Sequence, residues 1–145
     1  MANRIVRIES ITIENFKNVT QGTLDFENKR KDYKASVLGL YGQNGSGKTA
    51  LIDAIQLLKF ALCGKAIPKK YADYINVDAE YATLKYEFAV RYAEIVYSAW
   101  YQFSMRKVID ESTASADETT NANVTTKVEM FDEILSFSYE SETDK

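Results

Sequence analysis

The sequence predicts an α/β fold, in which a buried strand leads into a helix and antiparallel strands lie before and after this unit. Residues 37–41 form a short apolar run, which is typical of a strand buried on both faces. Apolar residues then recur at helical spacing, which predicts one buried stripe on a helix that ends at Gly64. This stripe consists of Leu51, Ile55, Leu58 and Leu62.

A glycine-rich octapeptide, residues 42–49, joins the predicted strand to the predicted helix and fills every fixed position of the pattern G-x-x-x-x-G-K-[ST]. Glycines allow successive backbone N–H groups to turn inward around phosphate oxygens. Lys48 adds a positive charge for the β and γ phosphates, Thr49 offers a hydroxyl to Mg²⁺, and the helix directs its positive end at the same anion. Because strand, loop and helix occur in the required order, we expect this motif to bind a nucleoside triphosphate.

Composition narrows the functional classes. The chain has 145 residues, of which 46% are hydrophobic and 27% charged, as expected for one globular domain. No apolar run approaches the roughly 18 residues of a membrane span, and no signal-peptide core follows the N-terminus, so a cytoplasmic location is expected. The single cysteine, Cys63, permits neither an internal disulfide nor a thiolate cluster for zinc.

The absence of histidine excludes a histidine base or a histidine metal site within this sequence. No glycine follows Gly64, which excludes the Asp-x-x-Gly loop of GTPases. Adenine is therefore the expected base.

Before the loop, the sequence predicts a β-hairpin. Apolar residues are interspersed among charged ones over residues 4–17, and residues 23–26 alternate with period two, so that residues 18–22 form the turn. The charged stretch 28–34 is either a solvated turn or a contact for nucleic acid or phosphate. The net charge of −3 favours the turn.

After the helix, alternating residues predict antiparallel strands over 84–90, 95–105 and 128–139, the last with Leu135, Phe137 and Tyr139 on one face. Residues 110–126 are polar and predict a mobile loop. Seven of the ten tyrosines lie from Tyr71 to Tyr101. They could stack on nucleic-acid bases, but their spacing favours core packing and cross-strand pairs.

Hydrolysis of a triphosphate requires a carboxylate for Mg²⁺. The candidates are Asp110-Glu111 and Asp132-Glu133, each preceded by apolar residues. Neither ends a run of four apolar residues, so a solvated hairpin edge is the favoured interpretation and no catalytic residue is assigned.

Several segments together resemble the amino-terminal portion of ABC-type ATPases of the SMC, RecF and OLD-like group. The resemblance is close over residues 5–64, and the aromatic strands after Tyr81 resemble the antiparallel subdomain that this group inserts after the first helix. It implies a P-loop NTPase head with a core parallel strand, a P-loop helix and an antiparallel β subdomain. The segments that carry it are residues 11–18, 22–26, 42–49 and 51–55.

The resemblance implies ATP and Mg²⁺ as cofactors, with Thr49 as the metal-binding residue and with Lys17, Asn18 and Val19 on the adenine side. It also implies a second ATPase head as a homodimer partner, with DNA as a partner by family analogy only and no membrane. The residues expected to bind nucleotide are Gly42, Gln43, Asn44, Gly45, Ser46, Gly47, Lys48, Thr49, Ala50, Lys17 and Asn18.

The sequence has no Leu-Ser-Gly-Gly signature, no Walker B strand and no switch histidine. We therefore expect residues 1–145 to form a single partial head, the first portion of a longer ATPase, with a hairpin, P-loop and helix in 1–66 and a β subdomain in 78–140. Alone it should bind ATP weakly and hydrolyse it slowly or not at all. The alternatives are a self-contained small P-loop kinase, which would need Asp110 or Asp132 for Mg²⁺, and a non-catalytic interaction domain with a vestigial loop.

Overall fold

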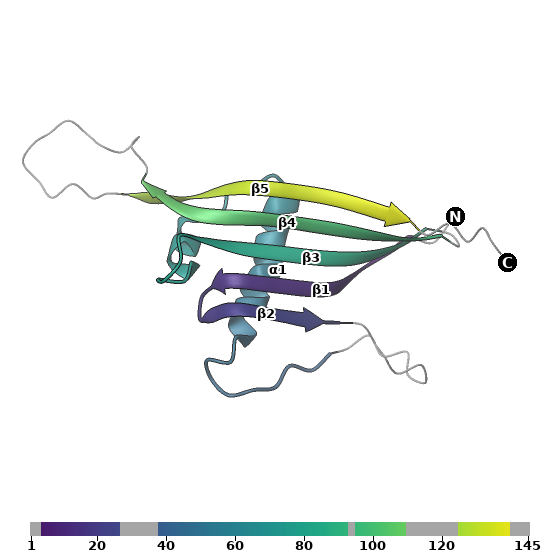
Figure 1. Cartoon of the computed structure of the whole chain (residues 1–145), viewed down its shortest axis with the longest axis horizontal. Helices are drawn as coiled ribbons and strands as arrows, with labels where there is room; N and C mark the ends of the chain where they lie inside the picture. Colours follow the sequence, from purple (N-terminus) through teal and green to yellow (C-terminus); the bar gives the residue numbers. More distant parts are fainter. Residues whose placement is uncertain (1–3, 27–37, 93–94, 110–124, 140–145) are drawn as a thin grey trace, which may run out of the picture.

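The structure is a computed structural model that describes residues 4–26, 38–92, 95–109 and 125–139. These residues form a sheet of five antiparallel strands, and the helix α1 crosses one face of the sheet (Figure 1). The strand order is β2-β1-β3-β4-β5. The strands are β1 (Arg4–Phe16), β2 (Val19–Asp25), β3 (Tyr81–Tyr92), β4 (Ile95–Ile109) and β5 (Thr126–Tyr139), and the helices are α1 (Lys48–Leu62) and the 3₁₀ helix η1 (Lys69–Tyr74).

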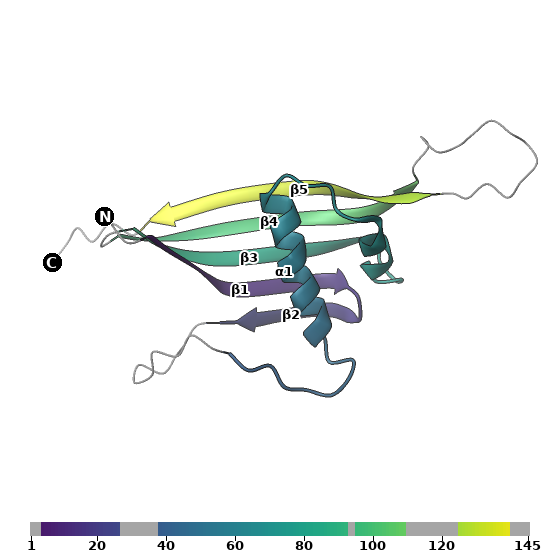
Figure 2. The ribbon, with the colours of Figure 1, turned by 180° about the vertical axis from the view of Figure 1, so that it is seen from behind.

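The core lies between α1 and the face of the sheet that it crosses (Figure 2). Apolar residues at every second position of β1, β3 and β4 point to this face, because side chains alternate along a strand. The Tyr86 hydroxyl donates a 2.7 Å hydrogen bond to the carbonyl of Ala54, which ties the sheet to the middle of α1. The largest buried side chains of these three strands are Ile11, Phe16, Leu84, Tyr86, Phe103 and Met105.

The helix was predicted correctly, but its buried stripe was predicted only in part. Leu51 and Leu58 are buried, whereas Ile55 and Leu62 are 41% and 60% exposed. The helix turns a different line of residues to the sheet, because three alanines let its backbone approach closely. The buried residues of α1 are Ala50, Leu51, Ala54, Leu57, Leu58 and Ala61. It ends at Leu62, and Gly64 follows with a left-handed φ of 60°, as predicted for a helix end.

The predicted core parallel strand at 37–41 is wrong for its described part. Residues 38–43 have no regular secondary structure, and Leu38, Leu40 and Tyr41 are 54%, 42% and 95% exposed. Every strand pair among the described residues is antiparallel. A strand buried on both faces needs hydrogen-bonding neighbours and cover on each side, and within the described chain no strand lies beside residues 38–41. Residue 37 is outside the described residues.

The hairpin before the loop is confirmed with a shorter turn. β2 begins at Val19, so that only Lys17 and Asn18 connect the strands instead of residues 18–22. Both residues that flank Phe16, Asn15 and Lys17, have a left-handed φ of 54°, which produces this tight reversal. The charged stretch 28–34 lies outside the described residues.

The later strands are confirmed and are longer than predicted. β5 begins at Thr126, so the last residue of the predicted loop 110–126 belongs to a strand, and residues 110–124 lie outside the described residues. Core packing is confirmed for Tyr71, Tyr86 and Tyr101, which are at most 3% exposed. Within the described residues, no helix is long and apolar enough to cross a membrane.

Candidate phosphate-binding site

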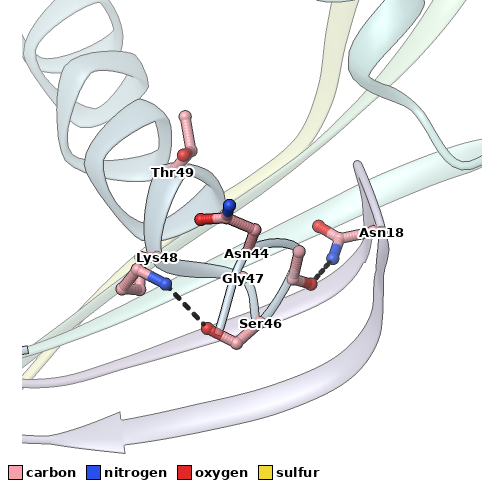
Figure 3. Close-up of a pocket in the computed structure, with 7 residues that line it drawn as sticks. Asn18, Asn44, Ser46, Gly47, Lys48 and Thr49 are labelled. Atoms are coloured by element: carbon pink, nitrogen blue, oxygen red, sulfur yellow. Dashed lines mark hydrogen bonds between the residues drawn. The ribbon is translucent and has the colours of Figure 1, made fainter. Parts of the chain in front are cut away.

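The glycine-rich loop leads directly into α1 (Figure 3), and glycine favours its shape at three positions. Gly45 and Gly47 have left-handed φ values of 85° and 87°, which other residues adopt only with strain. At Gly42, a Cβ atom would lie 2.7 Å from the Ser46 side-chain oxygen, so a side chain there would force Ser46 to move. The Ser46 N–H donates to the carbonyl of Gln43 at 3.2 Å and completes the turn.

The first turn of α1 has no side-chain cap. Gly47 occupies the N-cap position, no acidic residue follows in the first turn, and the first helical hydrogen bond runs from the Leu51 N–H to the Gly47 carbonyl at 3.1 Å. Backbone N–H groups at a helix start lack helical acceptors and carry the positive end of the helix dipole. This helix start is therefore suited to an anion.

The Lys48 ammonium lies over the loop and donates three hydrogen bonds to it. Its acceptors are the carbonyl oxygens of Gly42 and Gln43, both at 2.7 Å, and the Ser46 hydroxyl at 3.1 Å. An ammonium has three donors, so the loop satisfies all of them. A phosphate oxygen in the loop would take over some of these donors and gain a full positive charge as its partner.

Together these residues line a hollow of about 110 Å³. One lining residue, Asn18, comes from the turn between β1 and β2, and its side-chain amide donates to the carbonyl of Gly45 (Figure 3). Ala50, also expected to bind nucleotide, turns its side chain into the core and is 1% exposed. The hollow is lined by Asn18, Asn44, Gly45, Ser46, Gly47, Lys48 and Thr49.

Lys17, the neighbour of Asn18, has other partners. Its ammonium is paired with the Asp53 carboxylate on α1 and lies 4.1 Å from the centre of the Tyr74 ring. The two paired side chains are 21% and 17% exposed. Sequence reasoning missed Asp53 and Tyr74, because their link to Lys17 joins segments far apart in the chain. The only sequence signal for this link was Asp53 itself, an acidic residue on the predicted helix next to the predicted buried stripe.

The candidate carboxylates on β5 lie far from the loop in the sheet order. β5 is at one edge, and β2, whose hairpin turn touches the loop, is at the other. Glu133 accepts a 2.6 Å hydrogen bond from the Tyr101 hydroxyl. Asp110 and Glu111 lie outside the described residues. Across the described part of the chain, no three histidine, cysteine or acidic residues gather in a group that could hold a metal.

The sequence of residues 42–49 and the uncapped helix that starts within it are those of a P-loop domain. The chain belongs to the AAA domain family, whose sequence profile matches residues 10–141, and it corresponds to the SMC- and RecF-like amino-terminal ATPase part.

Two curated relatives share the name DNA replication and repair protein RecF. The protein from Azobacteroides pseudotrichonymphae genomovar. CFP2 is 45% identical over 53 residues, which are 37% of this chain and 13% of the relative. The protein from Deinococcus radiodurans is 38% identical over 52 residues, which are 36% of this chain and 12% of the relative. The matched stretch is thus a small part of each relative's length. No solved structure matches the chain.

Proposed function

We propose that this chain binds ATP together with Mg²⁺ through residues 42–49. The observation that carries the proposal is the conformation of the loop: two left-handed glycines precede a helix start that has no side-chain cap, and a lysine ammonium lies across them. Backbone N–H groups of the loop would surround the phosphates, and Lys48 would add charge. Magnesium would bring the charge neutralisation that phosphoryl transfer needs, with Thr49 as its protein ligand.

The base side of the site rests on the resemblance. It assigns Lys17 and Asn18 to adenine, and of these two it is Asn18 that lines the hollow. Lys17 would first have to leave Asp53 and Tyr74. Binding of adenine in preference to guanine remains part of the proposal.

We further propose that the chain is the amino-terminal portion of a cytoplasmic ATPase in which two heads pair. In the family, each nucleotide is held between the P-loop of one head and the signature motif of the other. Hydrolysis is then expected from the full-length dimer and not from these residues alone, because the sequence has neither the Leu-Ser-Gly-Gly signature nor a Walker B strand that would supply the metal carboxylate. The relatives' name includes DNA replication and repair, which makes DNA a candidate partner of the whole protein by analogy.

Replacement of Lys48 by alanine tests the binding proposal. We expect Lys48→Ala to weaken binding of a fluorescent ATP analogue at least about tenfold, because a charge-assisted bond to phosphate contributes about 1.5–3 kcal/mol. Lys59→Ala removes an equal charge from the exposed side of the same helix and should bind like the parent. Asp132→Ala should also bind like the parent.

Equal affinity of Lys48→Ala and the parent would contradict the proposal. Two further measurements distinguish the alternatives. Steady ATP turnover by the isolated chain, lost in Asp132→Ala, would favour a self-contained kinase. A melting temperature that saturating Mg²⁺ and ATP fail to raise would favour an interaction domain with a vestigial loop.

A further inference from the structure

We propose that Asn18 is a positioning residue for the phosphates: its side-chain amide holds the Gly45 carbonyl and so keeps the turn at residues 43–46 in the shape that lines the hollow. This inference rests on the proposed function, since it concerns the same hollow. It gives Asn18 a role toward the phosphates, whereas the family resemblance places it toward adenine.

Packing does not hold the loop at Gly45. A Cβ atom built there would meet nothing within 4 Å, and the backbone is in the left-handed region that glycine leaves readily. The bond from the Asn18 amide to the Gly45 carbonyl restrains this exposed position. Because a carbonyl and the next N–H belong to the same planar peptide unit, fixing the Gly45 carbonyl also supports the hydrogen bond that the Ser46 N–H donates to the Gln43 carbonyl.

Asn18 is itself held on a rigid support. Its neighbour Lys17 is paired with Asp53 on α1 and lies over the Tyr74 ring, and the Lys17 N–H donates to the Tyr74 carbonyl. Phe16, the next residue toward β1, is completely buried and pairs with Ile75. Two adjacent residues of the turn therefore connect it to the helix and to the loop. Lys17 binds Asp53 on α1, and Asn18 donates to the Gly45 carbonyl in the loop.

The chemistry of the side chain fits this role. A carboxamide donates to a carbonyl without adding charge beside a polyphosphate. An aspartate at the same position would bring a carboxylate against the Gly45 carbonyl and beside the phosphates, and both contacts would be repulsive. An alanine would remove the restraint and leave the rest of the turn in place.

The test compares Asn18→Ala and Asn18→Asp with the parent in titrations with Mg²⁺-ATP and with Mg²⁺-tripolyphosphate, which has no base. Gln21→Ala, exposed on β2 in the same hairpin, is the matched control. We expect Asn18→Ala to weaken both ligands by the same factor, about tenfold, and Asn18→Asp to weaken both further. Loss of ATP affinity with unchanged tripolyphosphate affinity would assign Asn18 to the base and overturn the inference, as would unchanged affinity for both.

Amide hydrogen exchange of the ligand-free chain separates this inference from the proposed function. Asn18→Ala should speed exchange at Ser46, whose N–H donates to the Gln43 carbonyl, and leave the amides of β3 and β4 unchanged. Unchanged exchange at Ser46 would overturn the positioning role even if the parent binds ATP. If the parent binds neither ligand, the proposed function fails, and the exchange measurement still decides whether Asn18 restrains the loop.

Discussion

At the scale of single residues, two buried tyrosines are expected to make the folded chain less stable at alkaline pH. Burial raises the pKa of Tyr86, and the charge of the nearby Tyr101 phenolate would raise it further. Burial also raises the pKa of Tyr101, to which the hydrogen bond and the charge of Glu133 add. Since both pKa values are raised in the folded chain, folding favours the neutral phenols. Their contribution is complete below the ordinary tyrosine pKa of about 10 and is lost as the pH rises above it.

We therefore expect the melting temperature to fall between about pH 9 and pH 11. Tyr86→Phe removes one of the ionising groups and should show a shallower fall over this range. At neutral pH the same variant should be less stable by about 1 kcal/mol, because its bond to the Ala54 carbonyl is lost. Tyr81→Phe, in which the exposed ring at the start of β3 is changed, serves as the control. Identical slopes for Tyr86→Phe and the parent would contradict the argument.

The loop residues were predictable from the sequence, and the support of the loop was not. The fixed letters of residues 42–49 encode local requirements: left-handed backbone at Gly45 and Gly47, and a helix that starts at Lys48. The bond from Asn18 to Gly45 joins residues 27 positions apart. No local pattern predicts such a contact, and only the family resemblance gave Asn18 a role in the site.

At the scale of elements, the face of α1 that packs on the sheet determines which substitutions destabilise the fold. Leu57 is completely buried, whereas Ile55, which the predicted stripe included, is 41% exposed. We expect Leu57→Ala to lower the free energy of unfolding by about 2–5 kcal/mol, because it leaves a cavity against the sheet. Ile55→Ala should cost less than about 1 kcal/mol. Chemical denaturation of both variants measures the difference, and a larger loss for Ile55→Ala would show that the helix packs through the predicted stripe.

Strands and helix differ in how completely the sequence predicts them. In β3 and β4 the sequence shows clearly which residues are buried, because bulky residues such as Leu84, Tyr86 and Phe103 alternate with polar ones. In α1 the alanines carry part of the buried face, and a small side chain gives little signal of burial. The apolar run at 38–41 was misread for another reason. Whether such a run forms a strand depends on neighbours elsewhere in the fold, which local periodicity does not reveal.

At the scale of the whole molecule, the sheet and helix leave apolar surface uncovered. α1 crosses the middle of one sheet face and covers only part of it (Figure 2). Leu135 and Phe137 of β5 pair with Tyr101 and Ala99, so they share this face, and they are 57% and 66% exposed. The outer side of α1 also exposes Ile52. Neighbouring exposed apolar side chains such as Leu135 and Phe137 are typical of a surface that another part of a protein covers.

The exposed apolar surface around Ile52 on α1 should be detectable in the isolated chain with a dye that fluoresces when it binds apolar surface. We expect Ile52→Lys to lower dye fluorescence while the free energy of unfolding changes by no more than about 0.5 kcal/mol, because Ile52 is 66% exposed. Gln56→Lys adds the same charge to the exposed side of α1 without removing apolar surface, and should leave the fluorescence unchanged. If Ile52→Lys instead destabilised the chain by several kcal/mol, Ile52 would belong to the core. In a longer protein whose remaining segments pack on α1, the same substitution should become destabilising, because the lysine would then be buried without a partner.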